Sequence, residues 1–402
     1  MAFIPIDELK GQTQAAPQAL DWREALGFRP FFLLAAGSAI ALVGVWIAVF
    51  VFGAPLATLY GPLGWHGHEM IYGYAAAVIA GFLLTAVTNW TNLPTATGPA
   101  LAGLVVLWLA GRVLPFFDGR VPRGVIALAD LAFLPALGVA LARPILKARR
   151  RKDLAFLAIL TVFTVANLFV HTEALGWTAG TSRPAIFVGL DLTLLLIAII
   201  GGRVLPYFTS KALPGAAPRQ NTILDRVAIG ATIAFGLARL FALPGWIAGP
   251  VAVVATLSHG ARLVGWHDRR VWGRPILWVL YVGYGFLVLG YALEAAAAFG
   301  AVGAAVPWHA FNVGAIGGLT LGMMSRVGLG HTGRPLVVDP RIRTAFGLLY
   351  ASAAVRLLAF AVPGAYRGLL TATAGLWVAA FALFLVVYTP ILTAARPDGK
   401  AG

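Results

Sequence analysis

The stretch at residues 31–52, FFLLAAGSAIALVGVWIAVFVF, carries no charged side chain and decides the class of fold. A helix needs about 20 mostly apolar residues to cross the hydrocarbon core of a bilayer, so these residues are expected to form one transmembrane helix. The same length and character recur at residues 69–89, 99–117, 122–142, 153–172, 185–205, 224–243, 246–265, 275–297, 306–328, 342–362 and 367–392. The sequence therefore predicts an all-α, polytopic membrane bundle of about twelve transmembrane helices, with residues 1–402 forming a single transmembrane domain.

The composition agrees with a chain surrounded by lipid. Sixty per cent of the residues are hydrophobic, only 11% are charged, and the mean hydropathy is +0.85, whereas soluble domains carry about 25% charged residues. The chain has no cysteine, which excludes disulfides, thiolate metal sites and cysteine-bound iron–sulfur clusters. Any metal must therefore be held by histidine, carboxylate, methionine or carbonyl groups.

The net charge of +15 reflects membrane topology and not a nucleic-acid partner, because the basic residues lie between the apolar segments. With the N-terminus inside, 23 of the 30 Lys and Arg residues fall in the inner segments, as the positive-inside rule requires. Both termini are expected in the cytoplasm. Residues 1–30 are a mixed polar cytoplasmic segment with no apolar core, so they are not a cleavable signal peptide, and the first helix serves as an uncleaved signal anchor.

A weak internal repeat recurs every four helices. Arg112, Arg239 and Arg356 each stand a few residues before a proline in the third, seventh and eleventh predicted helices. Four is an even number, so the repeated units share one orientation and are related by an axis along the membrane normal. The proposed pseudo-repeats are residues 22–148, 149–266 and 267–396. Chance similarity among apolar segments is the alternative, since the matched words are short.

Four histidines are expected in one layer near the outer end of the bundle. His68 and His309 stand at the same distance before the threonine that ends their helices, His66 belongs to the motif Trp-His-Gly-His, and His171 ends a helix that runs outward. Imidazole suits copper and haem iron, so we predict metal binding by all four. On a helix, however, the two rings of a His-x-His motif diverge by about 200°. The alternative is a set of interfacial histidines bonded to carbonyl or lipid groups.

A second, inner site is predicted from depth alone. His259 and His331 are expected at similar depths in their helices, so they are candidates for cofactor binding at a shared site. His267 falls in a solvated loop, and no role is expected for it. The remaining intramembrane Asp and Arg residues are expected to pair structurally, while Glu173 and Glu294, at outer helix ends, are candidate proton acceptors.

Several short sequence motifs together resemble those of the NnrS family. They are FRPFF at 28–32, WHGHEM at 65–70, GGRV at 201–204 and LGMMSRV at 321–327, and the resemblance covers about residues 27–340. It implies a bacterial inner-membrane protein that contains b-type haem and copper and acts on nitric oxide, in denitrification or in defence against nitrosative stress. Members of the family often carry histidine where this chain has Tyr281.

A weaker likeness connects the predicted architecture with the catalytic subunit of haem-copper oxidases and nitric oxide reductases. That subunit also has twelve helices in three units of four, and histidines of its second and tenth helices bind the two faces of a low-spin haem. His68 and His309 are on the corresponding helices, so we expect them to share one haem. The paired histidines of the oxidase's helix seven are missing here.

The leading hypothesis is thus a haem- and copper-binding membrane protein that binds, reduces or otherwise removes nitric oxide. Catalytic turnover, which would make it an oxidoreductase similar to nitric oxide reductase, and the electron donor are left open. One alternative is a multi-helix transporter that uses the intramembrane Arg, Asp and His residues as a substrate or proton path. Another is a metal sensor or assembly factor without turnover.

Overall fold

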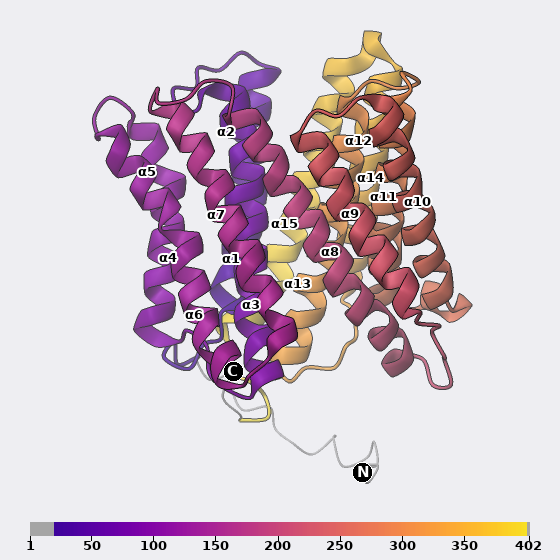
Figure 1. Ribbon diagram of the computed structural model, residues 1–402. Coiled ribbons are helices and arrows are strands. Elements are labelled where there is room, and N and C mark those ends of the chain that lie inside the picture. Colours follow the sequence, from indigo (N-terminus) through magenta and orange to yellow (C-terminus); the bar gives the residue numbers. More distant parts are fainter. Residues whose placement is uncertain (1–19, 400–402) are drawn as a thin grey trace.

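The computed structural model describes residues 20–399, which contain helices and no β-strand (Figure 1). Short 3₁₀ turns join several of the longer elements. The helices are α1 (Phe28–Phe50), α2 (Gly61–His68), η2 (Glu69–Ala75), α3 (Ala76–Thr91), α4 (Gly98–Val113), α5 (Arg123–Leu131), α6 (Phe133–Lys147), α7 (Leu154–Ala174), α8 (Ser182–Ala212), α9 (Thr222–Leu240), α10 (Gly245–Trp266), α11 (Pro275–Ala298), α12 (Ala305–His309), η6 (Ala310–Gly317), α13 (Gly318–His331), α14 (Pro340–Ala361) and α15 (Tyr366–Thr393).

Within this described part, ten helical segments are long and apolar enough to cross a membrane. The other two predicted spans are also helical at their expected positions, but they are more polar. Helix α9 carries Asp225, Arg226 and Arg239, and the α12–η6–α13 segment carries His309 and Asn312 among many glycines. The prediction of an all-α polytopic bundle is therefore confirmed, and the two more polar spans lie among the others in Figure 1.

Both described ends of the chain lie at the same end of the bundle (Figure 1). The amide of Leu20 donates a hydrogen bond to the carbonyl of Thr393 at 3.4 Å, and the Arg29 guanidinium donates to the carbonyls of Leu392 and Ala394 at 2.9 and 2.8 Å. An even number of crossings is required by this arrangement. Arg29 of the FRPFF motif at 28–32 thus ties the first helix to the last.

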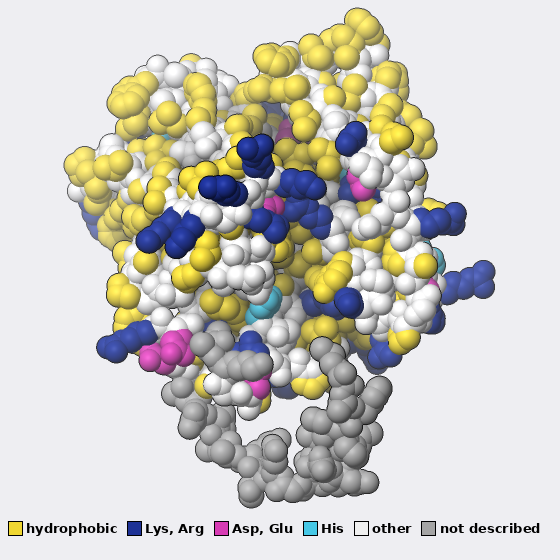
Figure 2. All heavy atoms as spheres, turned by 60° about the horizontal axis from the view of Figure 1, so that its bottom comes forward, with side chains coloured by type: hydrophobic (Ala, Val, Ile, Leu, Met, Phe, Trp, Pro, Cys, Tyr) yellow, Lys and Arg dark blue, Asp and Glu magenta, His cyan; other side chains and the backbone are white. Residues whose placement is uncertain are grey.

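Basic side chains gather at that same end, which faces the viewer in Figure 2. This distribution is the one from which the cytoplasmic orientation is predicted. Lys10 and Lys400, which also contribute to that prediction, lie outside the described residues. The orientation itself stays a prediction, because the structure contains no membrane.

One predicted helix is broken in the structure. The span at 122–142 consists of α5 and α6, which are interrupted at Ala132. Pro135 explains the interruption, because its nitrogen has no hydrogen to donate and its ring would clash with the carbonyl of Leu131, four residues earlier. The break lies one residue from the end of α5, whose buried face carries Asp130.

Candidate metal centre

Two π-helical segments lie in the half of the bundle away from the chain termini, and each begins directly after a predicted ligand. Segment η2 follows His68, and η6 follows His309. π-Helical turns inside α-helices are rare and frequently occur at functional sites. The local structure around His68 and His309 is therefore alike, as their matching positions in the sequence suggest.

His66 and His68 do not point the same way, because both lie in the regular helix α2. Two residues along an α-helix correspond to a rotation of about 200°. The two side chains consequently enter different clusters. His68 faces α5 and α7, whereas the His66 ring stacks on Trp46 of α1, with 4.3 Å between ring centroids.

His68 meets His171 and Asp130 inside the protein. The Nε2 atom of His171 lies 2.8 Å from Asp130 Oδ2, and the Nε2 atom of His68 lies 3.2 Å from the same oxygen. One potential ligand atom from each of the three residues lies within 4.8 Å of the other two. Both histidines have no exposed surface, and Asp130 is 4% exposed. Three separate helices thus bring two imidazoles and one carboxylate to one buried point.

Further polar groups hold this triad in place. Glu69 Oε1 lies 3.0 Å from His68 Nδ1, and Asn167 bridges the triad, with its Nδ2 donating to Asp130 Oδ2 at 2.8 Å and its Oδ1 lying 3.0 Å from His68 Nε2. Arg112 forms ion pairs with Asp130 and, at 3.2 Å, with Glu69. Two carboxylates thus face a single guanidinium. With both histidines neutral the cluster carries one negative charge, and a buried charge of that kind calls for a cation.

The geometry suits a single metal ion. Metal–nitrogen and metal–oxygen bonds of about 2.0–2.2 Å place neighbouring ligand atoms roughly 2.9–3.4 Å apart in common coordination geometries, close to the 2.8 and 3.2 Å that separate the imidazole nitrogens from Asp130 Oδ2. The contact between His68 Nδ1 and Glu69 leaves Nε2 as the ligand atom, as is usual for metal-bound histidine. The same distances also fit hydrogen bonds, in which case a proton on His68 supplies the positive charge.

The surroundings of His68 fit a porphyrin less well than an ion. Tyr60 and Tyr72 stack on the His68 ring, with centroid separations of 4.4 and 4.9 Å. A haem ligated by His68 would require these rings to move. Haem ligation shared by His68 and His309 stays a prediction, and the contacts of His68 join it instead to His171, at 5.9 Å between ring centroids.

His309 belongs to another cluster, with Arg356. His309 Nδ1 lies 2.8 Å from the carbonyl of Ala305, and its Nε2 lies 3.0 Å from Arg356 Nη2. Tyr366, which also contacts Arg356, packs against the cluster of Ile47 and Val51 at the end of α1, the helix on which the His66 ring stacks. Of the four histidines predicted in the outer layer, the structure thus brings His68 and His171 together, whereas His309 contacts Arg356 and His66 stacks on Trp46.

The contacts of His259 and His331 do not join these two residues. His259 interacts with α9 and α11, since its Nε2 lies 3.0 Å from Thr232 Oγ1 and its Nδ1 lies 2.7 Å from the hydroxyl of Tyr284. The ring of His331 instead packs against Phe28 of α1, at 5.8 Å between centroids. A shared inner site for His259 and His331 stays a prediction that these contacts do not support.

Comparison with known proteins identifies the family. The profile described as NnrS protein matches residues 24–396, nearly the whole chain. The chain belongs to the NnrS family. The match is longer than the range of residues 27–340 suggested by the sequence motifs, and it includes the last helices, which contain none of those motifs. No curated protein sequence matches the chain.

The position at which other NnrS proteins were expected to carry histidine lies away from the triad. The hydroxyl of Tyr281 donates to the carbonyl of Trp266 at 2.7 Å and lies 2.8 Å from Thr209 Oγ1. Tyr281 is buried in this network near the end of the bundle where the chain termini lie. His267, expected in a solvated loop, is exposed there and accepts a hydrogen bond from Trp272.

Sequence reasoning placed His68 and His171 in one layer of this NnrS protein but missed their acidic partner. Asp130 was expected only to pair structurally. The available signal was its depth, because Asp130, Arg112 and Asn167 all fall in the outer halves of their predicted spans. Glu69 was visible as the neighbour of His68, but its contact with that ring depends on the π-helical turn that begins there.

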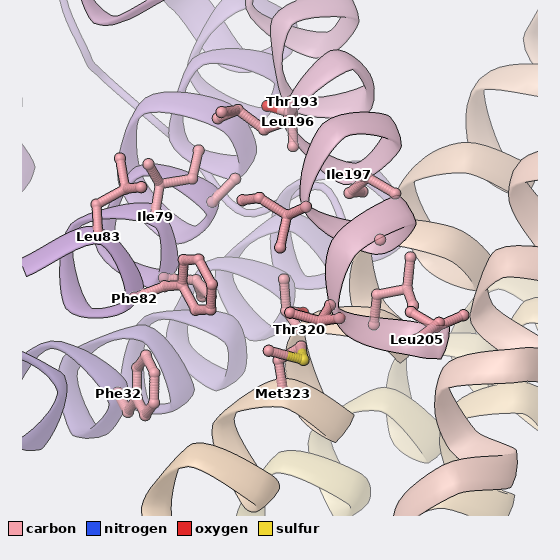
Figure 3. Close-up of a pocket in the computed structure, with 16 residues that line it drawn as sticks. Phe32, Ile79, Phe82, Leu83, Thr193, Leu196, Ile197, Leu205, Thr320 and Met323 are labelled. Carbon is pink, nitrogen blue, oxygen red and sulfur yellow. The ribbon is translucent and has the colours of Figure 1, made fainter. Parts of the chain in front are cut away.

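An apolar cavity of about 90 Å³, partly open at the side of the bundle, lies between α1, α3, α8 and α13 (Figure 3). Phe32, Phe82, Ile197 and Met323 are among the side chains around it, and no histidine lines it. The hydroxyl of Thr193, also in its wall, donates to the carbonyl of Gly189 at 2.9 Å. The cavity therefore offers almost purely apolar walls.

Proposed function

We propose that this NnrS-family protein binds copper at His68, His171 and Asp130 and acts on nitric oxide in a bacterial inner membrane. The observation that carries the proposal is the buried triad, in which two imidazoles and a carboxylate meet beside a second carboxylate, Glu69, and a single guanidinium, Arg112. Imidazole is a preferred ligand of copper, and the chain has no cysteine to offer as a thiolate ligand.

Nitric oxide as the ligand is supported by family membership and by the apolar interior. The molecule is small and apolar enough to dissolve in lipid, so it needs no polar channel to reach the bundle. Dry apolar cavities bind small apolar ligands such as xenon, and the 90 Å³ cavity has the walls required for that. A copper ion in the triad would supply a direct binding site for the gas.

Haem is the second cofactor in the proposal, and it rests on the family alone. His309, His259 and His331 are the remaining candidate ligands, and none of them lines the cavity. The proposed orientation places both termini in the cytoplasm and the triad in the outer half of the bilayer. An electron donor is required only if nitric oxide is reduced.

The test is metal analysis and an absorption spectrum of the purified protein, before and after addition of nitric oxide. We expect bound copper in the wild-type protein and its loss in His171→Ala. His68→Ala should also lose copper, whereas His267→Ala, in the exposed loop, should retain it. Full copper content in both triad variants would contradict the assignment.

Absorption spectra of the same samples test the haem prediction. A Soret band in the wild-type spectrum would establish haem, and its loss or conversion in His309→Ala would identify the axial ligand. Alanine is the best helix former, so this substitution leaves the helix intact. A colourless protein without copper or haem would remove the proposed function and favour the transporter alternative.

A further inference from the structure

Three arginines that occupy matching places in the sequence pattern differ in how their charges are balanced. Arg112 of α4 forms ion pairs with two carboxylates, Glu69 and Asp130. Arg239 of α9 likewise forms ion pairs with two carboxylates, Asp191 at 3.0 Å and Glu294. In both places a guanidinium within the bundle is neutralised by acidic side chains from neighbouring helices. Arg356 of α14, the third arginine of this pattern, is different.

Only neutral groups surround Arg356. Its Nη2 contacts His309 Nε2 at 3.0 Å and the hydroxyl of Tyr366 at 3.4 Å, and its guanidinium lies over the ring of Phe360, 4.2 Å from the centroid. No carboxylate in the described part of the chain pairs with it, and its Nη1 is buried without a hydrogen-bond partner. The residue is 5% exposed.

His309 is itself neutral in this arrangement. Its Nδ1 faces the carbonyl of Ala305 at 2.8 Å, so the proton is assigned to Nδ1 from the hydrogen-bond network. Nε2 then accepts the hydrogen bond from Arg356. Because His309 cannot offset the guanidinium, the cluster retains one positive charge.

His66 supplies a second buried nitrogen without a partner at the same end of the bundle. Its Nδ1 has no hydrogen-bond partner, and its ring stacks on Trp46 of α1 at an interplanar angle of 8°. Tyr366, which contacts Arg356, packs against Ile47 and Val51 of the same stretch of chain. A buried polar group without a partner is destabilising, and an unbalanced charge at membrane depth more so. An anion that accepts hydrogen bonds would balance the charge of Arg356 and would also provide partners for the unpaired nitrogen atoms.

We propose that Arg356 and His66 form a binding site for an oxyanion at the outer end of the bundle. A guanidinium presents parallel N–H groups that match two oxygens of a planar oxyanion or of a phosphate, and the free Nη1 of Arg356 leaves such a donor available. The site lies one turn from the end of α14, at the end of the bundle that holds α2 and α12 (Figure 1). It shares no residue with the metal triad, and it requires that His309 Nε2 accepts from Arg356 and does not bind haem.

A free small oxyanion and the phosphate of a phospholipid share this chemistry. The test uses protein purified in detergent and stripped of phospholipid, with thermal unfolding measured as sodium nitrite replaces sodium chloride at constant ionic strength. A second arm adds phosphatidylglycerol in place of nitrite. We expect a saturable rise in Tm in one of the two arms, and the arm that responds identifies the source of the oxyanion.

The rise must depend on Arg356. Arg356→Gln is expected to abolish it, whereas Arg239→Gln, which removes an arginine already paired with two carboxylates, should retain it. His66→Leu removes one hydrogen bond to the anion and should raise the apparent Kd about 10–100-fold, as expected for a hydrogen bond to a charged group. This variant also decides the matter if Arg356→Gln does not fold. The proposal would be overturned if Tm rose in neither arm. It would also be overturned if Arg356→Gln and His66→Leu showed the same rise in Tm as the wild-type protein.

A further variant supplies the missing charge from within the chain. Ala310 follows His309 as Glu69 follows His68, at the start of the corresponding π-helical segment. Ala310→Glu should therefore place a carboxylate near Arg356 and make unfolding independent of added oxyanion. Undiminished dependence in a folded Ala310→Glu protein would argue that the anion binds elsewhere.

Discussion

Replacing Asp130 by asparagine removes the one carboxylate that contacts both histidines of the triad. The substitution keeps the shape of the side chain, and Arg112 keeps Glu69 as an ion-pair partner at 3.2 Å, but one of the two carboxylate charges that face Arg112 is lost. Removing one partner from a buried charge pair typically costs about 3–5 kcal/mol. If that loss falls on metal binding, the affinity for copper drops by roughly 100-fold to 4,000-fold, at about 1.4 kcal/mol for each tenfold change.

The consequence is measurable as copper-dependent stability. At a free copper concentration 100 times the Kd, a bound ion stabilises the wild-type protein by about 2.7 kcal/mol. A 100-fold weaker site at the same concentration would gain only about 0.4 kcal/mol by the same relation. Thermal unfolding of Asp130→Asn in detergent, with and without copper, should therefore show almost none of the wild-type shift.

The matched control is Asp191→Asn. Asp191 also pairs with a buried arginine, Arg239, at 3.0 Å, but no histidine lies in that pair. Its replacement disturbs a similar ion pair and should leave the copper-dependent shift intact. A wild-type shift in Asp130→Asn, or an equal loss in both variants, would refute the assignment of Asp130 as a ligand.

Three further outcomes are expected from the described geometry. Gly111→Ala places a Cβ atom 2.5 Å from Asp130 Oδ1 and should lower copper retention without changing any ligand, whereas Gly103→Ala on the same helix meets nothing within 4 Å and should have no effect; equal retention in both would show that the carboxylate position is unimportant. A reporter active only in the periplasm should remain inactive when fused after Gly402, and strong activity would reverse the predicted orientation. Xenon should occupy the cavity between α3, α8 and α13 in a crystal under pressure, and its absence there would mean that the cavity is closed to small apolar ligands.

The helices were predictable because their apolar runs are long enough to span lipid and are separated by short polar segments. Helix breaks were harder to place. Pro135 was visible in the sequence, yet a hydropathy window reads across it, because hydropathy takes no account of the missing N–H or of the clash of the proline ring. The π-helical turns η2 and η6 leave no comparable mark, because they depend on packing with neighbouring helices.

The site was predictable in depth but not in pairing. Counting residues along each span places His66, His68, His171 and His309 at one level, because the rise per residue of a helix is fixed. Which residues meet at that level depends on the rotation of each helix about its own axis, and apolar helices buried on several sides give little signal for that rotation. His68 therefore contacts Asp130 and His171 of α7, whereas its expected partner was His309 of α12.

The π-helical turn after His68 makes the length of that segment as important as its composition. A residue adds about 100° of rotation to everything that follows in a regular helix, and a π turn absorbs an extra residue without passing all of that rotation on. Deleting one residue from η2 would therefore be expected to restore an ordinary helix with little rotation of α3. The side chains within the segment would change direction instead, and Glu69, which contacts His68 and Arg112, is among them.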